Sequence, residues 1–204
     1  MSFSEFFSKQ AQRPNGLFGK LIMSLIFSKG NAALNKFTYE LMSVQKDDKI
    51  LEIGFGTGNL INIMAKHINK GMIEGLDFSD TMFSIAQKKN KKYIMNGKVK
   101  LFNANFDEII LEKDNYTKVC SVNTIYFWEN PDKTINKIAE ILKPKGKLVL
   151  AFEDKPRKKN SNIFKVYTKE EVHDLLIKHG FLGGVTMNSR KKEKAVFHCA
   201  VAIK

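Results

Sequence analysis

The chain has 204 residues, of which 43% are hydrophobic and 27% are charged, and its formal net charge is +13. This length and composition fit one sizeable α/β domain and argue against two domains or a disordered chain. The charge is compatible with a nucleic-acid partner or an anionic surface. However, the basic residues are almost all lysines, with arginine only at positions 13, 157 and 190, so we favour a solvated surface over a phosphate-reading patch.

No part of the chain predicts a membrane span, a leader or a metal site. The apolar stretch at residues 17–27 is interrupted by Lys20, is too short for a bilayer and lacks a cleavage site of small residues. Cys120 and Cys199 lie in strand-like segments and lack the spacing of metal ligands. We therefore expect a reduced, cytoplasmic protein without a metal.

Residues 1–45 differ from the rest of the chain, because apolar residues at helical spacing are interrupted by Pro14 and several glycines. This pattern predicts two or three short helices. Their many aromatic residues suggest an N-terminal helical lid or cap that closes an apolar substrate pocket over the sheet. Packing on the sheet edge and dimerisation are the alternatives. Residues 46–204 are then the core domain.

From residue 49 onward, short apolar runs alternate with helix-like segments. Strands are predicted over 49–55, 71–78, 99–106, 116–127, 144–154, 183–189 and 194–204, with helices over 58–68, 79–95, 130–143 and 167–181. Such alternation predicts an α/β three-layer sandwich around a mostly parallel sheet of seven strands. The last two strands follow each other without a helix, so we expect an antiparallel C-terminal hairpin around a basic turn at residues 190–194.

The stretch "ILEIGFGTGNL" places Gly54, Gly56 and Gly58 directly after the first predicted strand. Glycine there permits positive φ and a close approach of the backbone to a ligand. The dinucleotide pattern G-x-G-x-x-G fails because Asn59 occupies its third glycine position, and no P-loop Lys-Ser or Lys-Thr follows. The pattern that does match is E-x-G-x-G-x-G, beginning at Glu52. A tight turn without a ligand is the alternative.

Polar and aromatic residues follow the next two strands. Asp77 ends the second strand, where a carboxylate can accept both hydroxyls of a ribose. Phe78 comes next, and Met82 follows one turn later. Asn105 and Phe106 end the third strand. The alternatives are that Asp77 caps the following helix and that Asn105 is a turn residue.

These segments resemble, in order and spacing, the motifs of the class I S-adenosylmethionine-dependent methyltransferases over residues 46–204. The family usually has Asp at the position of Asn105 and glycine at that of Lys145. The tetrapeptide Asn-Pro-Pro-Tyr or Asp-Pro-Pro-Tyr, typical of members that methylate base amino groups, is replaced by residues 123–126. The resemblance therefore favours a small-molecule methyltransferase, similar to those of quinone biosynthesis, with a Rossmann-like fold.

The resemblance implies S-adenosylmethionine as cofactor, S-adenosylhomocysteine as product and transfer by in-line displacement, in which a general base is optional. It places Tyr126 and Trp128 near the transferred methyl group, and the alternative is that both are ordinary core or rim aromatics. Tyr126 is also a candidate for a catalytic residue, and Glu153 and Asp154, which follow the fifth strand, are candidates for a base. We expect a monomer or homodimer. The cofactor-binding residues that it implies are Glu52, Gly54, Gly56, Gly58, Asp77, Phe78, Met82, Asn105, Phe106 and Asn123.

Three other functions remain as alternatives. An RNA or protein methyltransferase could use the basic clusters at residues 88–92, 157–159 and 190–194, and its affinity for RNA would depend steeply on salt. A cofactor-binding module without turnover would share the glycine motif. A nicotinamide-dependent dehydrogenase fits the glycine spacing least well.

Overall fold

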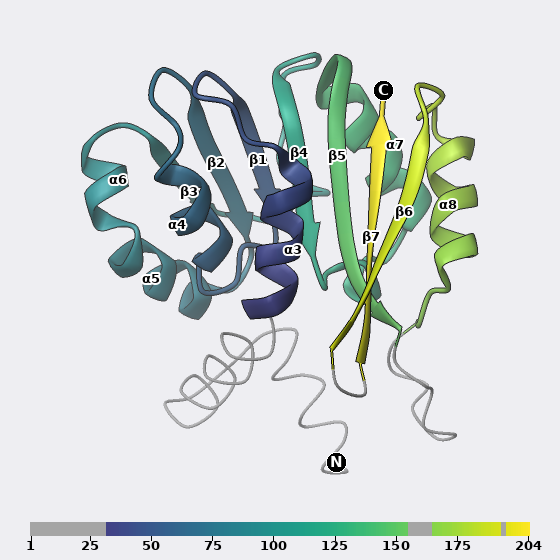
Figure 1. Ribbon diagram of the computed structural model, residues 1–204. Helices are drawn as coiled ribbons and strands as arrows, with labels where there is room; N and C mark the ends of the chain where they lie inside the picture. The colour runs from purple at the N-terminus through teal and green to yellow at the C-terminus, as the bar shows by residue number, and fades with distance from the viewer. Residues whose placement is uncertain (1–31, 155–164, 193–194) are drawn as a thin grey trace.

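A single sheet of seven strands runs through the computed structural model, which describes residues 32–154, 165–192 and 195–204 (Figure 1). The strand order is β3-β2-β1-β4-β5-β7-β6, and β7 is antiparallel to both of its neighbours. The strands are β1 Lys49–Ile53, β2 Met72–Asp77, β3 Val99–Asn103, β4 Tyr116–Val122, β5 Leu142–Asp154, β6 Val185–Lys192 and β7 Ala195–Ile203. The predicted mostly parallel sheet with an antiparallel C-terminal hairpin is confirmed.

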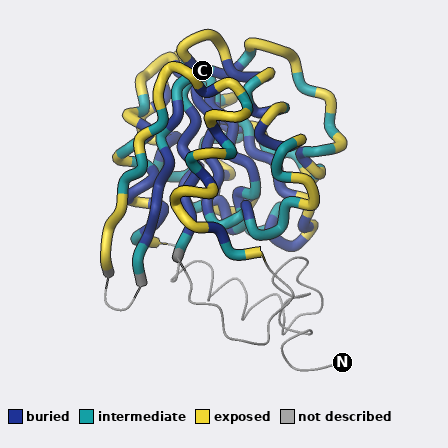
Figure 2. The backbone as a smooth tube through the Cα atoms, turned by 90° about the vertical axis from the view of Figure 1, so that its right-hand side faces the viewer, coloured by how far each residue is buried: buried dark blue, intermediate teal, exposed yellow. Residues whose placement is uncertain are grey.

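Helices cover both faces of this sheet. One face carries α3 (Ala32–Met42), α4 (Asn59–Ala65) and α5 (Asp80–Lys89), and the other carries α7 (Pro131–Ile141) and α8 (Lys169–Lys178) (Figure 1). Each face has its own apolar core, so the strands between the two layers are largely buried while the outer sides of the helices are exposed (Figure 2). Side chains buried on both faces explain the near-continuous apolar runs of β1, β4 and β5.

The helix between β2 and β3 differs from its prediction. We expected one helix over residues 79–95, but α5 ends at Lys89 and a short α6 (Lys91–Met95) follows. Asn90 lies at the break, and its buried carboxamide donates to the carbonyl oxygens of Gly58 and Ala86 at 3.1 and 3.0 Å. This residue therefore joins the end of α5 to the start of α4.

The basic turn predicted at residues 190–194 is wrong for its first three residues, which belong to β6 and pair with β7. Arg190 remains in the strand because it packs on α3. Its guanidinium lies 4.3 Å from the ring centre of Phe37 and forms an ion pair with Glu40 at 2.9 Å. Cation–π contact and ion pairing extend the strand beyond the point at which the charge pattern indicated a turn.

Helix α3 belongs to the segment predicted as an N-terminal cap. Its residues Leu34, Phe37 and Met42 are buried in the core shared with α4. The remainder of that segment, residues 1–31, lies outside the described residues, so the lid and its domain boundary stay predictions. Among the described residues, no helix is long and apolar enough to cross a membrane.

Candidate active site

A cavity of about 630 Å³ lies where β1, β2, β3 and β4 end and their following loops begin. This volume is in the range of small-molecule sites, and the carboxyl edge of a parallel sheet is where α/β proteins bind ligands. Of the predicted cofactor residues, all except Gly58 line it. The lining also includes Asn35, Thr57, Asn59, Leu76, Ser79, Asp107, Glu108, Thr124, Phe127, Trp128, Glu129, Lys133 and Thr134.

The three glycines of the first loop have three different reasons to lack a side chain. All have positive φ, at 71°, 52° and 70°. A Cβ on Gly54 would overlap the methyl group of Thr124, and a Cβ on Gly58 would lie 2.8 Å from that of Ala86 in α5. A Cβ on Gly56 would meet no protein atom within 4 Å. Gly58 thus serves helix packing, whereas Gly56 leaves space on the cavity side.

Two carboxyl groups are buried at the base of this cavity. Glu52 is 2% exposed, and its Oε2 atom is a buried oxygen that has no hydrogen-bond partner among the described residues. Burial and, second, the nearby charge of Asp77 raise the pKa of Glu52 well above its ordinary value. A backbone hydrogen bond from Ile61 acts in the opposite direction. Because Oε2 itself has no donor and a buried unpaired oxygen is costly, a cationic or donor group of a ligand in the cavity would stabilise Glu52.

Asp77 also holds the glycine loop in place. Its Oδ2 accepts from the N–H of Gly56 at 2.8 Å, and its Oδ1 accepts from the N–H of Ser79 at 2.9 Å. Burial raises the pKa of Asp77 to about 6, although these two hydrogen bonds act in the opposite direction. The helix-capping alternative for Asp77 is not what the structure shows, because the N-cap of α5 is Ser79, which accepts from the N–H of Met82.

The far side of the cavity is more apolar. Phe78 is 44% exposed although it is a large apolar side chain, and Met82 is buried beside it in the lining. Phe106 is buried in the core and also lines the cavity. Asn105 lines the cavity too, but its carboxamide accepts from the N–H of Asp107 at 3.1 Å, as a turn residue does. Together these residues form a slot suited to a flat, partly apolar group.

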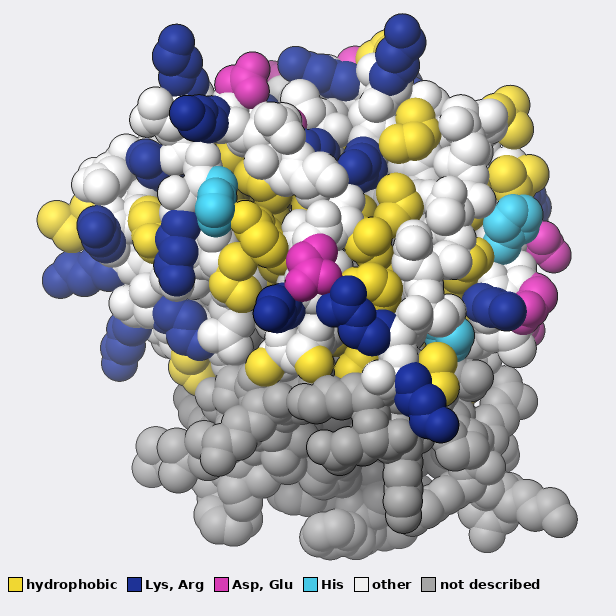
Figure 3. Space-filling model, viewed as in Figure 1, with side chains coloured by type: hydrophobic (Ala, Val, Ile, Leu, Met, Phe, Trp, Pro, Cys, Tyr) yellow, Lys and Arg dark blue, Asp and Glu magenta, His cyan; other side chains and the backbone are white. Residues whose placement is uncertain are grey.

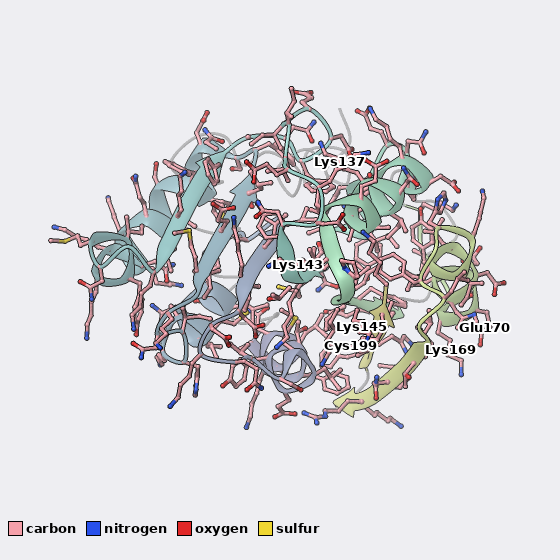
Figure 4. The ribbon with its side chains drawn as sticks, turned by 90° about the horizontal axis from the view of Figure 1, so that it is seen from above. Lys137, Lys143, Lys145, Lys169, Glu170 and Cys199 are labelled. Carbon is pink, nitrogen blue, oxygen red and sulfur yellow. The ribbon has the colours of Figure 1, made fainter. Side chains whose placement is uncertain are left out.

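Lys137 of α7 fixes the loop that carries Phe106, a role that the sequence pattern did not reveal. Its Nζ donates to the carbonyl oxygens of Phe106 and Ile109 and lies 4.9 Å from the ring centre of Phe106. Figure 4 labels this side chain on α7. Burial lowers the pKa of Lys137. The lysine thus positions one wall of the cavity from outside it.

The segment after β4 was expected to continue as a strand to residue 127, but the strand ends at Val122. Asn123 has a φ of 55°, and a 3-10 turn, η1 (Ile125–Phe127), follows. Asn123 lines the cavity, and its Nδ2 donates to Glu153 Oε1 at 3.2 Å. The strained backbone turns this segment across the cavity instead of along the sheet.

Two of the catalytic candidates, Tyr126 and Glu153, do not line the cavity. The hydroxyl of Tyr126 accepts from the backbone N–H of Glu153 at 2.6 Å and lies 3.0 Å from the carbonyl oxygen of the same residue. This arrangement fastens the segment after β4 to the end of β5. Trp128 does line the cavity, as expected for a residue near the acceptor.

Sequence reasoning missed Asn35, Lys133 and Thr134 as lining residues. Asn35 belongs to α3, which the sequence pattern assigned to a separate cap, and the other two lie in the first turn of α7. Neither a glycine motif nor a strand end marks these positions. The one available signal was Pro131, which indicates that the next residues begin a helix at the sheet edge.

The fold and the glycine loop at the edge of the sheet are those of the methyltransferase class. Residues 50–146 match the family described as "Methyltransferase domain". The chain is 28% identical over 154 residues to the uncharacterized methyltransferase YdaC of Bacillus subtilis, covering 76% of this chain and 83% of that protein. It is 30% identical over 156 residues to the demethylmenaquinone methyltransferase of Bacillus licheniformis, covering 71% and 64%.

The fold is also shared with a solved S-adenosylmethionine-dependent methyltransferase from Aquifex aeolicus. The TM-score is 0.67 at 18% identity, covering 83% of this chain and 89% of the other. The chain belongs to the class I S-adenosylmethionine-dependent methyltransferases, as its sequence motifs implied.

Proposed function

We propose that this enzyme binds S-adenosylmethionine in the cavity and transfers its methyl group to a small-molecule acceptor. The observation that carries the proposal is that Glu52 and Gly56 line the same cavity. Glu52 presents a buried oxygen without a partner, and Gly56 has open space where a side chain would stand. An amino acid nucleoside meets both features, because its ammonium group can donate to the carboxylate and its ribose can lie against the backbone.

The cavity residues fit the successive parts of that cofactor. Glu52 and the glycine loop suit the methionyl group, and the second lone pairs of the Asp77 oxygens remain available to ribose hydroxyls. Phe78, Met82 and Phe106 form the apolar slot for adenine. Asn105 can offer its amide to the base in place of the family's usual Asp.

When bound, the cofactor supplies a methyl group that its sulfonium already activates. The protein then has to align the acceptor with that methyl group and keep water away, and such alignment can supply about 7–11 kcal/mol of the barrier. Phe127 and Trp128 lie in the lining beyond the glycine loop and provide the apolar surface for this task. Tyr126 and Glu153, which are bonded to each other outside the cavity, support that surface.

We infer a small, flat acceptor from the aromatic lining and from the relative named for demethylmenaquinone. The alternative is an RNA or protein substrate held by the basic surface. On the face drawn in Figure 3, the Lys and Arg side chains are spread out rather than gathered into one patch, which favours the small acceptor. We retain the expectation of a cytoplasmic monomer or homodimer.

Thermal unfolding with S-adenosylmethionine, S-adenosylhomocysteine or NAD tests the cofactor. Ligand at about 100 times its dissociation constant should add about 2.7 kcal/mol and raise Tm by roughly 5–10 °C with the first two compounds only. Transfer of a labelled methyl group to quinols, to RNA and to protein then tests the acceptor. No shift with either adenosyl compound would refute the proposed cofactor, and transfer to RNA alone would refute the small acceptor.

A further inference from the structure

Asn35 is a buried polar residue of α3 for which the structure shows no partner. The side chain is 7% exposed and lines the cavity. No hydrogen bond joins its carboxamide to another described residue, although an amide has two donors and an acceptor to satisfy. The amide differs from Glu52 Oε2, which is the one fully enclosed side-chain oxygen or nitrogen without a partner among the described residues. The amide of Asn35 is instead reachable from the cavity, so its hydrogen-bonding capacity is available to a ligand there.

The position of α3 indicates which part of a ligand lies near Asn35. This helix packs against α4 and the strands β4, β5 and β7, on the opposite side of β1 from β2 and β3. Asp77 and Phe78 follow β2, so the adenosine end of the ligand would lie away from α3. Glu52 is on β1, which lies between β2 and the strands under α3. Asn35 thus lies at the end of the cavity that suits an amino acid group.

The geometry points to Asn35 as a positioning residue that donates from Nδ2 to the carboxylate of the cofactor's amino acid end. This inference rests on the proposed function. An amino acid end presents a cation that only donates and a carboxylate that only accepts. Ionised Glu52 can serve the ammonium group but not the carboxylate. Asn35 supplies the complementary donor, which would make α3 part of the binding unit rather than a cap.

Isothermal titration with S-adenosylhomocysteine and with 5′-deoxy-5′-methylthioadenosine tests this role. The second compound keeps the adenosine thioether and lacks the amino acid end. Asn35→Ala should weaken binding of S-adenosylhomocysteine about ten- to hundredfold, since a hydrogen bond to a charged group is lost. Binding of methylthioadenosine should change less than about threefold. Lys36→Ala, an exposed neighbour on α3, is the control and should bind both compounds like the wild type.

A second variant tests whether the donor group of Asn35 is what binds the ligand. It also serves as the test if the Asn35→Ala protein does not fold. Asn35→Asp keeps the size of the side chain but removes the donor, so it should bind S-adenosylhomocysteine at least as weakly as Asn35→Ala. Equal weakening for both compounds, unchanged binding, or tighter binding by the Asp variant would overturn the inference. If the wild-type protein binds neither compound, the proposed cofactor itself fails.

Discussion

Gly56 donates its backbone N–H to Asp77 Oδ2 across 2.8 Å, and this bond joins the loop after β1 to the end of β2. Asp77 is therefore both a candidate ribose ligand and the support of the glycine loop. A change at either residue should affect the ligand cavity and the fold together. The first two predictions separate these effects.

Gly56→Ala should weaken cofactor binding with only a moderate effect on stability. A side chain at φ 52° costs about 1–2 kcal/mol of backbone strain, and the new methyl group enters the open space beside the loop. We expect the dissociation constant for S-adenosylhomocysteine to rise at least about tenfold. Gly97→Ala is the matched control, because Gly97 has φ 70° and equally open space but does not line the cavity. Equal loss of binding in both variants would contradict the prediction.

Asp77 should make the ligand-free protein less stable as pH rises from about 4 to above 6. Its pKa is about 6 in the folded protein against an ordinary value of 3.8, so the unfolded chain releases this proton first. The favourable contribution is complete below pH 3.8 and is lost as pH rises through 6, on the order of 2–3 kcal/mol. Urea unfolding at several pH values should show a flatter dependence for Asp77→Asn. An identical dependence in the two proteins would exclude this role.

Glu52 should give up a proton when S-adenosylmethionine binds. Its pKa is raised by burial and by Asp77, whereas the cofactor's ammonium group stabilises the ionised form. The affinity should therefore increase as the pH rises, and calorimetry in buffers of different ionisation enthalpy should detect the released proton. The neighbouring Cys120 does not replace the ligand in this role. Burial and the charge of Glu52 raise the pKa of its thiol, and a thiol supplies no positive charge that would stabilise ionised Glu52. Glu52→Gln should bind more weakly and release no proton, and methylthioadenosine should release none from the wild type.

Tyr126→Phe should reduce stability rather than cofactor affinity. The hydroxyl accepts from the N–H of Glu153 at 2.6 Å, and loss of this bond should lower the free energy of unfolding by about 1 kcal/mol. Tyr93→Phe is the control, since no hydrogen bond of the Tyr93 hydroxyl to a described residue is recorded in the structure. An unchanged stability together with a hundredfold lower rate of methyl transfer would instead identify Tyr126 as a catalytic residue.

Lys145→Gly should stabilise the protein. Lys145 has φ 63° and is exposed in the first part of β5 (Figure 4), where related enzymes usually have glycine. Relief of about 1–2 kcal/mol of strain is partly offset by the flexibility of glycine in the unfolded chain, which leaves a gain of about 0.5–1 kcal/mol. Lys143→Gly, at a neighbouring exposed position without positive φ, should be destabilising. The midpoints of urea unfolding measure both effects.

The sequence by itself determined the layers of the fold and the loops that carry the cofactor site. Alternating apolar runs and helical segments are local patterns, and the end of each parallel strand must fall on one edge of the sheet. For this reason the sequence alone predicts that Glu52, Gly56 and Asp77 lie together. The family followed from the same residues because their spacing along the chain is what the motif records.

Only the tertiary structure decided how other elements complete the site. Gly58 spaces α4 from α5, Lys137 holds the loop of Phe106, and Asn35 reaches the cavity from a helix with no motif of its own. Tyr126 is bonded to the backbone at Glu153, 27 residues away. Such contacts depend on which helix packs on which face and at what angle, and a pattern with a period of a few residues does not encode that choice.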